Sequence, residues 1–171
     1  MLTIGVAIAI PEPWATQLQD YRTSIGDHTA QHIPTHITLV PPVDVAEEDL
    51  AALQEHLEAT AATRRPFRIH LRGTGTFRPV SPVVFVSVVE GISECEQLAE
   101  VVRSGPLAVD LAFPYHPHVT IAHHLDDATL DRAFAELSAF DCQFEAESFA
   151  LYLHEQEEGW RPERTFELGR R

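Results

Sequence analysis

Lysine is absent from the 171-residue sequence, so all 12 residues counted as lysine or arginine are arginine. This absence excludes a lysine nucleophile, a Schiff base and the lysine of a Walker-type phosphate loop. Acidic residues number 26, which gives a formal net charge of -14. Proteins that bind long nucleic acids usually carry a basic face, but the basic runs here are only pairs such as Arg64-Arg65 and Arg170-Arg171. The composition therefore favours a small or short substrate, although a locally positive cleft on an acidic protein keeps long RNA open as an alternative.

Cysteine and long apolar runs are also scarce. Cys95 and Cys142 have neither metal-binding nor redox spacing, and we expect them to be core or surface thiols. The apolar start lacks a basic leading segment and a small-residue cleavage site, and no later run is long enough to cross a bilayer. We therefore expect one compact domain over residues 1–171, in the cytoplasm, that is monomeric and needs neither a membrane nor an obligate protein partner.

The sequence contains an apparent internal repeat. Short runs rich in valine and isoleucine predict buried strands at 2–10 and 83–89. A helix is predicted after each of them, at 13–24 and at about 94–102, the second behind a capping-box pattern at Ser93 to Glu96. Each series then reaches the same histidine-x-threonine motif at a similar distance from its strand, which is the signature of a repeat.

Further elements follow each motif. Apolar residues at helical spacing predict helices around 50–57 and 130–137, with Asp44 and Asp126 as candidate N-cap residues. Later strands are predicted near 67–77, 143–153 and 165–168. The order strand, helix, strand, helix, strand, given twice, indicates an α+β fold of two similar lobes, formed approximately by residues 1–78 and 79–171.

Two connections in this scheme have distinctive compositions. Glycine and proline punctuate 73–82, and we expect this segment to cross between the lobes. The polar segment 154–162 is expected to be a mobile hairpin loop before the final strand. Neither half contains a glycine-rich phosphate loop, so the pattern does not indicate a doubly wound nucleotide-binding fold.

The two motifs combine imidazole and hydroxyl groups. In a strand, side chains two residues apart share a face, so His36 lies beside Thr38, and His118 lies beside Thr120. A neutral imidazole can accept a proton from an attacking hydroxyl or water, while a protonated one donates to the leaving oxygen. Threonine hydroxyls can donate to the non-bridging phosphate oxygens. A single motif is more simply a structural histidine, but two at matching positions predict a phosphoester site that needs no metal.

The doubled motif and its surroundings resemble a known family. The residues that carry the resemblance are HITLVPPV, LRGTGTFRPVSPVVFVSV, PYHPHVTIAHHL and the strand near 144–153, which together span nearly the whole chain. They are similar to the two-histidine (2H) phosphoesterase superfamily, and in particular to its bacterial group of RNA 2′,5′ ligases and 2′,3′-cyclic phosphodiesterases.

The resemblance implies both a fold and a function. It implies two lobes with pseudo-twofold symmetry, each an antiparallel sheet with helices on its outer face, around a central cleft lined by His36, Thr38, His118 and Thr120. It also implies acid/base catalysis by the histidines, phosphate binding by the threonines, no cofactor, and a nucleotide or short RNA with a cyclic or 2′,5′ phosphodiester as substrate. Many ligase-like members have a basic residue where this sequence has His123 and His124. Cyclic phosphodiesterase activity is therefore the preferred interpretation over RNA joining.

Four further residues are candidates for substrate contact. Phe77 and Tyr115 could stack on a base, Arg78 could reach a phosphate, and His123 lies just past the second motif. Core packing is the simpler role for the other aromatic residues considered, Phe113 and Trp160.

Several alternatives stay open at this point. His116 shares the strand face of His118, so a zinc site that includes His123 or His124 is one alternative, although no cysteine or carboxylate accompanies the cluster. The site could instead act on 2′,5′ linkages, or bind a phosphorylated ligand without turnover. The sequence does not assign which motif histidine is the acid and which is the base.

Overall fold

Two antiparallel four-stranded sheets form the centre of the structure, a computed structural model that describes residues 1–169 apart from the side chain of Gln31. The first sheet has the order β2-β1-β7-β8, and the second has the order β5-β4-β3-β6. The strand bounds, in chain order, are β1 Leu2–Ala9, β2 His36–Val45, β3 Phe67–Thr76, β4 Val83–Glu90, β5 His118–His123, β6 Asp141–Ala146, β7 Ser148–Glu155 and β8 Gly159–Glu167. Each motif strand, β2 or β5, lies at a sheet edge beside the opening strand of its half. The predicted α+β fold with two similar lobes is confirmed.

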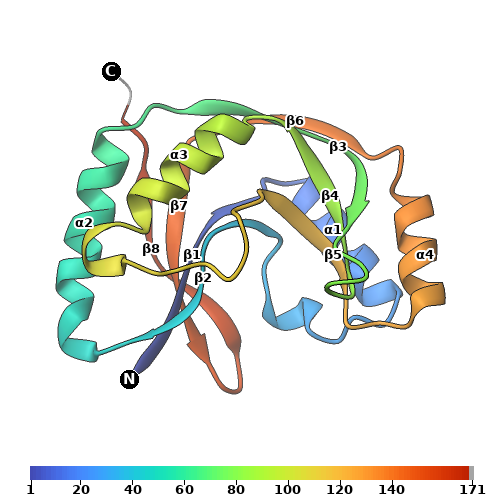
Figure 1. Cartoon of the computed structure of the whole chain (residues 1–171), viewed down its shortest axis with the longest axis horizontal. Coiled ribbons are helices and arrows are strands. Elements are labelled where there is room, and N and C mark those ends of the chain that lie inside the picture. The colour runs from blue at the N-terminus through green and yellow to red at the C-terminus, as the bar shows by residue number, and fades with distance from the viewer. Residues whose placement is uncertain (170–171) are drawn as a thin grey trace.

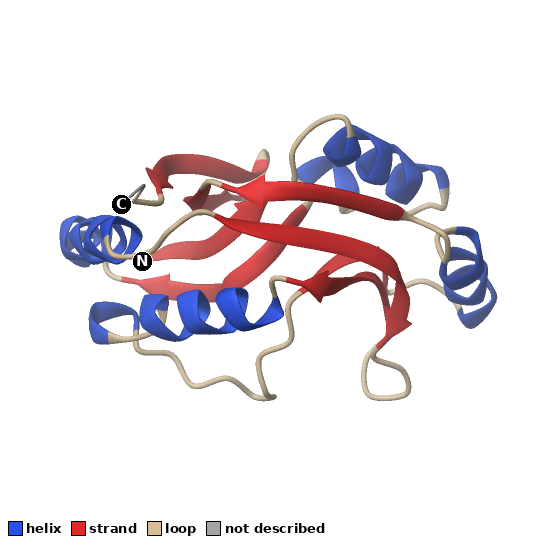
Figure 2. Cartoon of the chain, turned by 90° about the horizontal axis from the view of Figure 1, so that it is seen from above, coloured by secondary structure: helices blue, strands red, loops and turns tan. Residues whose placement is uncertain are grey.

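Each sheet carries two helices. The helices α2, Leu50–Ala62, and α3, Ile92–Val102, pack with the first sheet, whereas α1, Trp14–Ser24, and α4, Asp127–Glu136, pack with the second. Figure 1 shows one pair in each lobe, and the view from above in Figure 2 shows the two groups toward the two ends of the molecule. Among the described helices, none is long and apolar enough to span a bilayer.

Helical periodicity determines which side chains reach the core. On α4, Leu130 and Ala133 are fully buried, one turn apart, and face the sheet. Phe134, one of the apolar residues whose spacing predicted this helix together with Leu130 and Leu137, is 39% exposed because it follows Ala133 around the helix and points away from the sheet. Cys95 and Cys142 are buried free thiols, so both belong to the core.

The two halves of the chain exchange elements. The strand β3 from the first half lies in the second sheet, and β7 and β8 from the second half complete the first sheet. The helices exchange as well, because α1 packs on β5 and α3 packs on β2. The predicted boundary between 1–78 and 79–171 is therefore not the boundary between the sheets, and each lobe draws on both halves.

The segment 73–82, predicted to cross between the lobes, is instead a hairpin within the second sheet. The strand β3 continues to Thr76 and pairs antiparallel with β4, so only residues 77–82 form the connection. Gly75 lies within β3 and pairs with Phe85 of β4. The Phe85 ring occupies the space beside it, and a Cβ at this position would lie 2.6 Å from that ring. This glycine therefore serves strand packing and not a flexible linker.

The C-terminal strands also differ from the prediction. The single strand expected at 143–153 is two strands, β6 and β7, which are separated by Glu147 and belong to different sheets. The expected mobile loop at 154–162 is a hairpin whose turn covers only residues 156–158, because β8 begins at Gly159 and pairs with β7 from Glu155 onward. The final strand is accordingly longer than the predicted 165–168.

Of the predicted helix caps, one is confirmed and two are wrong. The Asp126 carboxylate accepts a 2.8 Å hydrogen bond from the Thr129 N–H and caps α4. Asp44 lies within β2, where it accepts a hydrogen bond from the Thr3 hydroxyl. The helix α3 begins before Ser93, and its N-cap is Gly91, whose φ of 96° favours glycine.

Candidate active site

The two histidine-x-threonine motifs open β2 and β5, which lie in contact across the two sheets. In both strands the side chains alternate as predicted, since Ile37 and Val119 are fully buried while the motif histidines and threonines are only partly buried. Leu39 and Ile121 are fully buried in the same core. Apolar packing on one face of each strand thus fixes the imidazole and hydroxyl groups on the other face.

A cleft of about 710 Å³ brings the two motifs together. His36, Thr38, His118 and Thr120 all line it. The first two come from the first sheet and the last two from the second, so the cleft lies between the lobes, as the family resemblance implied. Within the described residues, neither threonine hydroxyl forms a hydrogen bond, and both are therefore free to donate to a bound anion.

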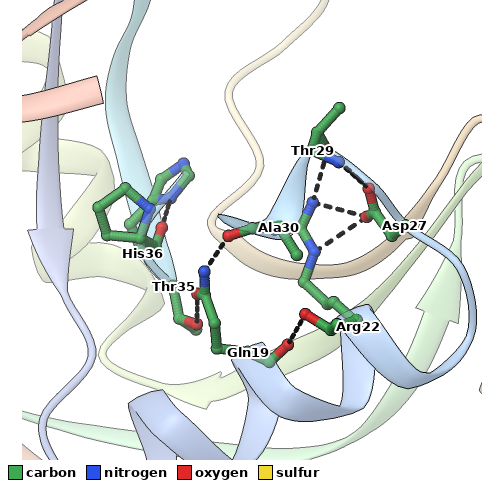
Figure 3. Close-up of polar contacts among 9 residues, drawn as sticks. Gln19, Arg22, Asp27, Thr29, Ala30, Thr35 and His36 are labelled. Carbon is green, nitrogen blue, oxygen red and sulfur yellow. Dashed lines mark hydrogen bonds and ion pairs between the residues drawn. The ribbon is translucent and has the colours of Figure 1, made fainter. Parts of the chain in front are cut away.

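The two motif histidines have the same hydrogen-bonding arrangement. Nδ1 of His36 lies 2.5 Å from the Pro34 carbonyl oxygen (Figure 3), and Nδ1 of His118 lies 2.6 Å from the His116 carbonyl oxygen. A carbonyl oxygen only accepts, so each Nδ1 carries the proton and donates it. The lone pair of each neutral ring is therefore on Nε2, which is the atom able to exchange a proton with a ligand.

Both histidines are neutral at pH 7. Burial lowers the pKa of His118 to about 4, although its hydrogen bond to the His116 carbonyl acts in the opposite direction. Burial also lowers the pKa of His36, and the positive charge of Arg22 adds to this effect. Positive charge on His36 further lowers the pKa of His118, so the two rings disfavour each other's protonation. An anion bound between them would favour protonation of one ring.

Comparison with known proteins agrees with this geometry. The family model described as the 2′-5′ RNA ligase superfamily matches residues 10–158. This chain belongs to the 2′-5′ RNA ligase superfamily. A Bacillus cytotoxicus protein, named as a candidate phosphoesterase, is 32% identical over 140 residues, which are 81% of each chain. The resemblance to 2H phosphoesterases is thereby confirmed, and the family and its relatives identify a phosphoesterase-type enzyme.

Solved structures share the fold of this 2′-5′ RNA ligase superfamily member. A Thermus thermophilus protein superposes with a TM-score of 0.73 at 24% identity, and 99% of each chain is covered. Escherichia coli LigT, crystallised with 3′-AMP, superposes with a TM-score of 0.70 at 22% identity, and 98% of each chain is covered. The two-lobed architecture is thus shared over essentially the whole chain.

Of the residues predicted to contact the substrate, Phe77 and Tyr115 line the cleft, whereas Arg78 does not. Phe77 lines the cleft and packs edge-on against His118, with 4.9 Å between ring centroids. Tyr115 also lines the cleft, and its hydroxyl donates a 2.7 Å hydrogen bond to the Thr38 carbonyl. Arg78 is not among the cleft-lining residues, because its guanidinium binds Asp131 of α4 at 2.9 Å. The structure therefore does not place Arg78 where we predicted a phosphate contact.

The first histidine past the second motif, His123, does not supply a charge to the cleft. His123 lines the cleft, and burial lowers its pKa, so this ring is neutral at pH 7. His124 lies beside it, with 3.8 Å between ring centroids. In the part of the chain that the structure describes, no three histidine, cysteine, aspartate or glutamate side chains form a group able to hold a metal ion. The zinc alternative therefore has no support in the geometry.

The described residues that line the cleft include one arginine, which comes from α1 and was not predicted from the sequence. Arg22 lines the cleft but is only 2% exposed, and its Nε and Nη2 bind Asp27 Oδ2 at 3.0 and 2.7 Å (Figure 3). Burial raises the pKa of Asp27, but hydrogen bonds from Thr29 and Arg22 outweigh burial and lower it overall. The pair is therefore ionised. An arginine four residues after Leu18, on the buried face of α1, was the available signal.

A second missed residue, Gln19, holds the start of β2. Its side-chain amide donates to the Ala30 carbonyl, and its Oε1 lies 3.1 Å from the Thr35 hydroxyl, which is a donor there (Figure 3). Thr35 is 3% exposed and directly precedes His36. Helix α1 thus fixes the backbone from which the first catalytic candidate projects.

Proposed function

We propose that this protein hydrolyses the 2′,3′-cyclic phosphate of nucleotides or RNA ends by metal-independent two-histidine catalysis. The observation that carries the proposal is the matched pair of His36 and His118, each with Nδ1–H bound to a backbone carbonyl and each lining one cleft. Matched tautomers on opposite sides of a ligand are what a reaction with one proton donor and one proton acceptor requires.

In the proposed reaction, water attacks phosphorus while one neutral imidazole takes a proton from that water at Nε2. A phosphorus–oxygen bond to the ribose breaks, and the second imidazole, protonated in the complex, gives its proton to the departing ribose oxygen. Thr38 and Thr120 donate to the non-bridging oxygens, and the positive charge of Arg22 offsets the developing negative charge. At the end of the reaction the base is protonated and the acid is neutral. Proton exchange with solvent then restores the starting protonation state of each histidine.

A bound phosphodiester stabilises the protonated form of the acidic histidine, which takes its proton from solvent. Both rings are neutral in the free protein, and a bound phosphodiester places a negative charge beside them that raises their pKa values. E. coli LigT, which shares the fold, was crystallised with 3′-AMP, NADP+ and ATP. These ligands support a nucleotide as the class of substrate for this protein.

The cytoplasmic location and the monomeric state expected from the sequence also remain proposals.

The experiment is incubation of the pure protein, with chelator present, with 2′,3′-cyclic AMP and separately with a 2′,5′-linked dinucleotide. Release of 2′- or 3′-AMP from the cyclic substrate is the expected result, and the isomer shows which phosphorus–oxygen bond breaks. Cleavage of the 2′,5′-linked dinucleotide alone would show that the same site acts on 2′,5′ phosphodiesters instead of cyclic phosphates. Binding of 3′-AMP without any product would favour a phospho-ligand binding module.

A further inference from the structure

The first sheet has a second apolar cluster on the face that its helices do not cover. Ala7, Ala150 and Tyr152 form a small buried cluster separate from the main core, and Trp160 packs against it. The strand pairing places Ala7 beside Ala150, and Gly5 beside Tyr152. The small side chains of Ala7 and Ala150, together with Gly5, leave space above this part of the sheet. The larger side chains of Tyr152 and Trp160 project beside that space.

A hollow of about 140 Å³ lies over this cluster. Gly5, Ala7, Tyr152 and Trp160 line it, together with Pro34 and Pro42. His36 and Thr38 line both this hollow and the catalytic cleft. A ligand whose phosphate binds His36 and Thr38 can therefore extend its adjoining group directly into the hollow.

The lining restricts what that group can be. Among the described residues that line the hollow, none is acidic and none is an arginine, so the hollow offers a second phosphate no counter-charge. Aromatic and proline side chains suit a flat, uncharged ring, and nucleobases present such a face. The Tyr152 hydroxyl forms no hydrogen bond to the residues that the structure describes, and it is available to the edge of a base.

In the other lobe, two aromatic rings pack directly on the motif histidine. Phe77 and Phe85 both pack on His118, with ring centroids 4.9 and 5.3 Å away, and Phe85 also packs on His116 at 5.2 Å. These rings fill the region next to the second motif. The pseudo-symmetric lobes therefore differ in what surrounds their motif histidines, and the apolar hollow described above lies on the His36 side.

We propose that this hollow is a nucleobase subsite, in which the base of the substrate contacts Trp160 and Tyr152 while its phosphate lies between the two histidines. The proposal rests on the proposed function and adds an orientation to it, with the base on the His36 side. Apolar and aromatic contacts recognise the ring itself, so discrimination among the four bases is expected to be weak.

Fluorescence tests the subsite without requiring turnover. The chain has two tryptophans. Trp14 lines neither the hollow nor the catalytic cleft, and its ring stacks on Phe144 with 6.4 Å between centroids. A Trp14→Phe variant leaves Trp160 as the single reporter. Titration with 3′-AMP is expected to change its emission saturably, whereas inorganic phosphate, which has no base, should leave it unchanged. An unchanged emission at saturating 3′-AMP, with binding verified by calorimetry, would overturn the proposal.

Kinetics give the second test. Trp160→Ala is expected to raise KM for 2′,3′-cyclic AMP by about tenfold, the loss of one base-to-ring contact, with a smaller change in kcat. Trp160→Phe, which retains a ring, should recover part of the loss if the alanine variant folds poorly. An unchanged KM in Trp160→Ala refutes the subsite even if hydrolysis is observed. A saturable Trp160 signal with no hydrolysis keeps the subsite and refutes the proposed reaction.

Discussion

The hydroxyl of Tyr115 donates a 2.7 Å hydrogen bond to the backbone carbonyl of Thr38, 77 residues away in the chain. This bond joins the segment before the second motif to the first motif. The Arg103 guanidinium lies over the Tyr115 ring, 5.3 Å from its centroid, and keeps the ring in place from the other side. The relative position of the two motifs thus depends on a contact between halves.

Tyr115→Phe is expected to lower the free energy of unfolding by about 1 kcal/mol, the usual effect of removing one hydrogen bond. It should also lower kcat several-fold, because Thr38 loses the contact that holds it opposite the second motif. Urea unfolding and initial rates measure the two effects. Tyr21→Phe is the matched control, since the Tyr21 hydroxyl binds Glu136 at 2.7 Å outside the cleft. An equal loss of kcat in both variants would contradict the role of Tyr115.

The pH profile of kcat/KM follows from the histidine pKa values. The reactive form has one histidine protonated and the other neutral, so its population is greatest between the two pKa values of the free enzyme. Burial lowers both pKa values from 6.5, that of His118 to about 4. The optimum of kcat/KM is therefore expected below pH 6.5. An optimum above pH 7 would contradict the assignment of the two histidines as acid and base.

Stability should depend on pH through the same groups. A lowered histidine pKa means that the unfolded state binds more protons, so the neutral histidine favours the fold above pH 6.5 and this contribution is lost as pH falls toward about 4. Replacing His118 by Gln is expected to flatten this part of the stability curve. Urea unfolding at pH 7, 6, 5 and 4.5 tests it, and an identical slope in the wild type and in His118→Gln would show that His118 does not contribute.

The buried ion pair gives a prediction about structure. Arg22→Met leaves the Asp27 carboxylate buried without its partner and is expected to lower the free energy of unfolding by about 3–5 kcal/mol. The double variant Arg22→Met with Asp27→Leu removes both charges and should recover most of that stability. It should not recover kcat/KM, because the cleft still lacks its cation. Recovery of both properties would mean that Arg22 is only structural.

Gly75→Ala tests the packing behind the second motif. The added Cβ would lie 2.6 Å from the Phe85 ring, and that ring packs on His118. The variant is expected to lose about 1–3 kcal/mol of stability from overpacking, with reduced kcat because His118 moves with the ring. Gly105→Ala is the control, since its φ of 60° strains the backbone but its nearest contact is His56 at 3.6 Å. A normal kcat in Gly75→Ala would show that the ring moves without disturbing His118.

Local pattern was sufficient to predict the motif strands. Ile37 and Leu39 alternate with His36 and Thr38, and this period of two is visible without knowledge of any neighbour. The positions of the four motif residues in one cleft then followed from the repeat and from the family resemblance.

The exchange of strands between lobes could not be predicted in this way, because pairing partners depend on the whole chain. Glu147 separates β6 from β7 and redirects the chain to the other sheet, yet a single residue leaves little trace in a hydrophobic pattern. Arg22 and Asp27 were missed for a related reason. Their partnership is local, but the place of Arg22 in the cleft depends on α1 packing against β5 of the other half.

The most direct test of the central claim is turnover of 2′,3′-cyclic AMP, with chelator present, by His36→Ala and His118→Ala. His70→Gln is the control, because His70 lies outside the cleft and binds Asp141. We predict that each alanine variant folds normally and loses roughly 100-fold or more in kcat, while the control retains full activity. Wild-type turnover in both folded alanine variants would contradict two-histidine catalysis at this site.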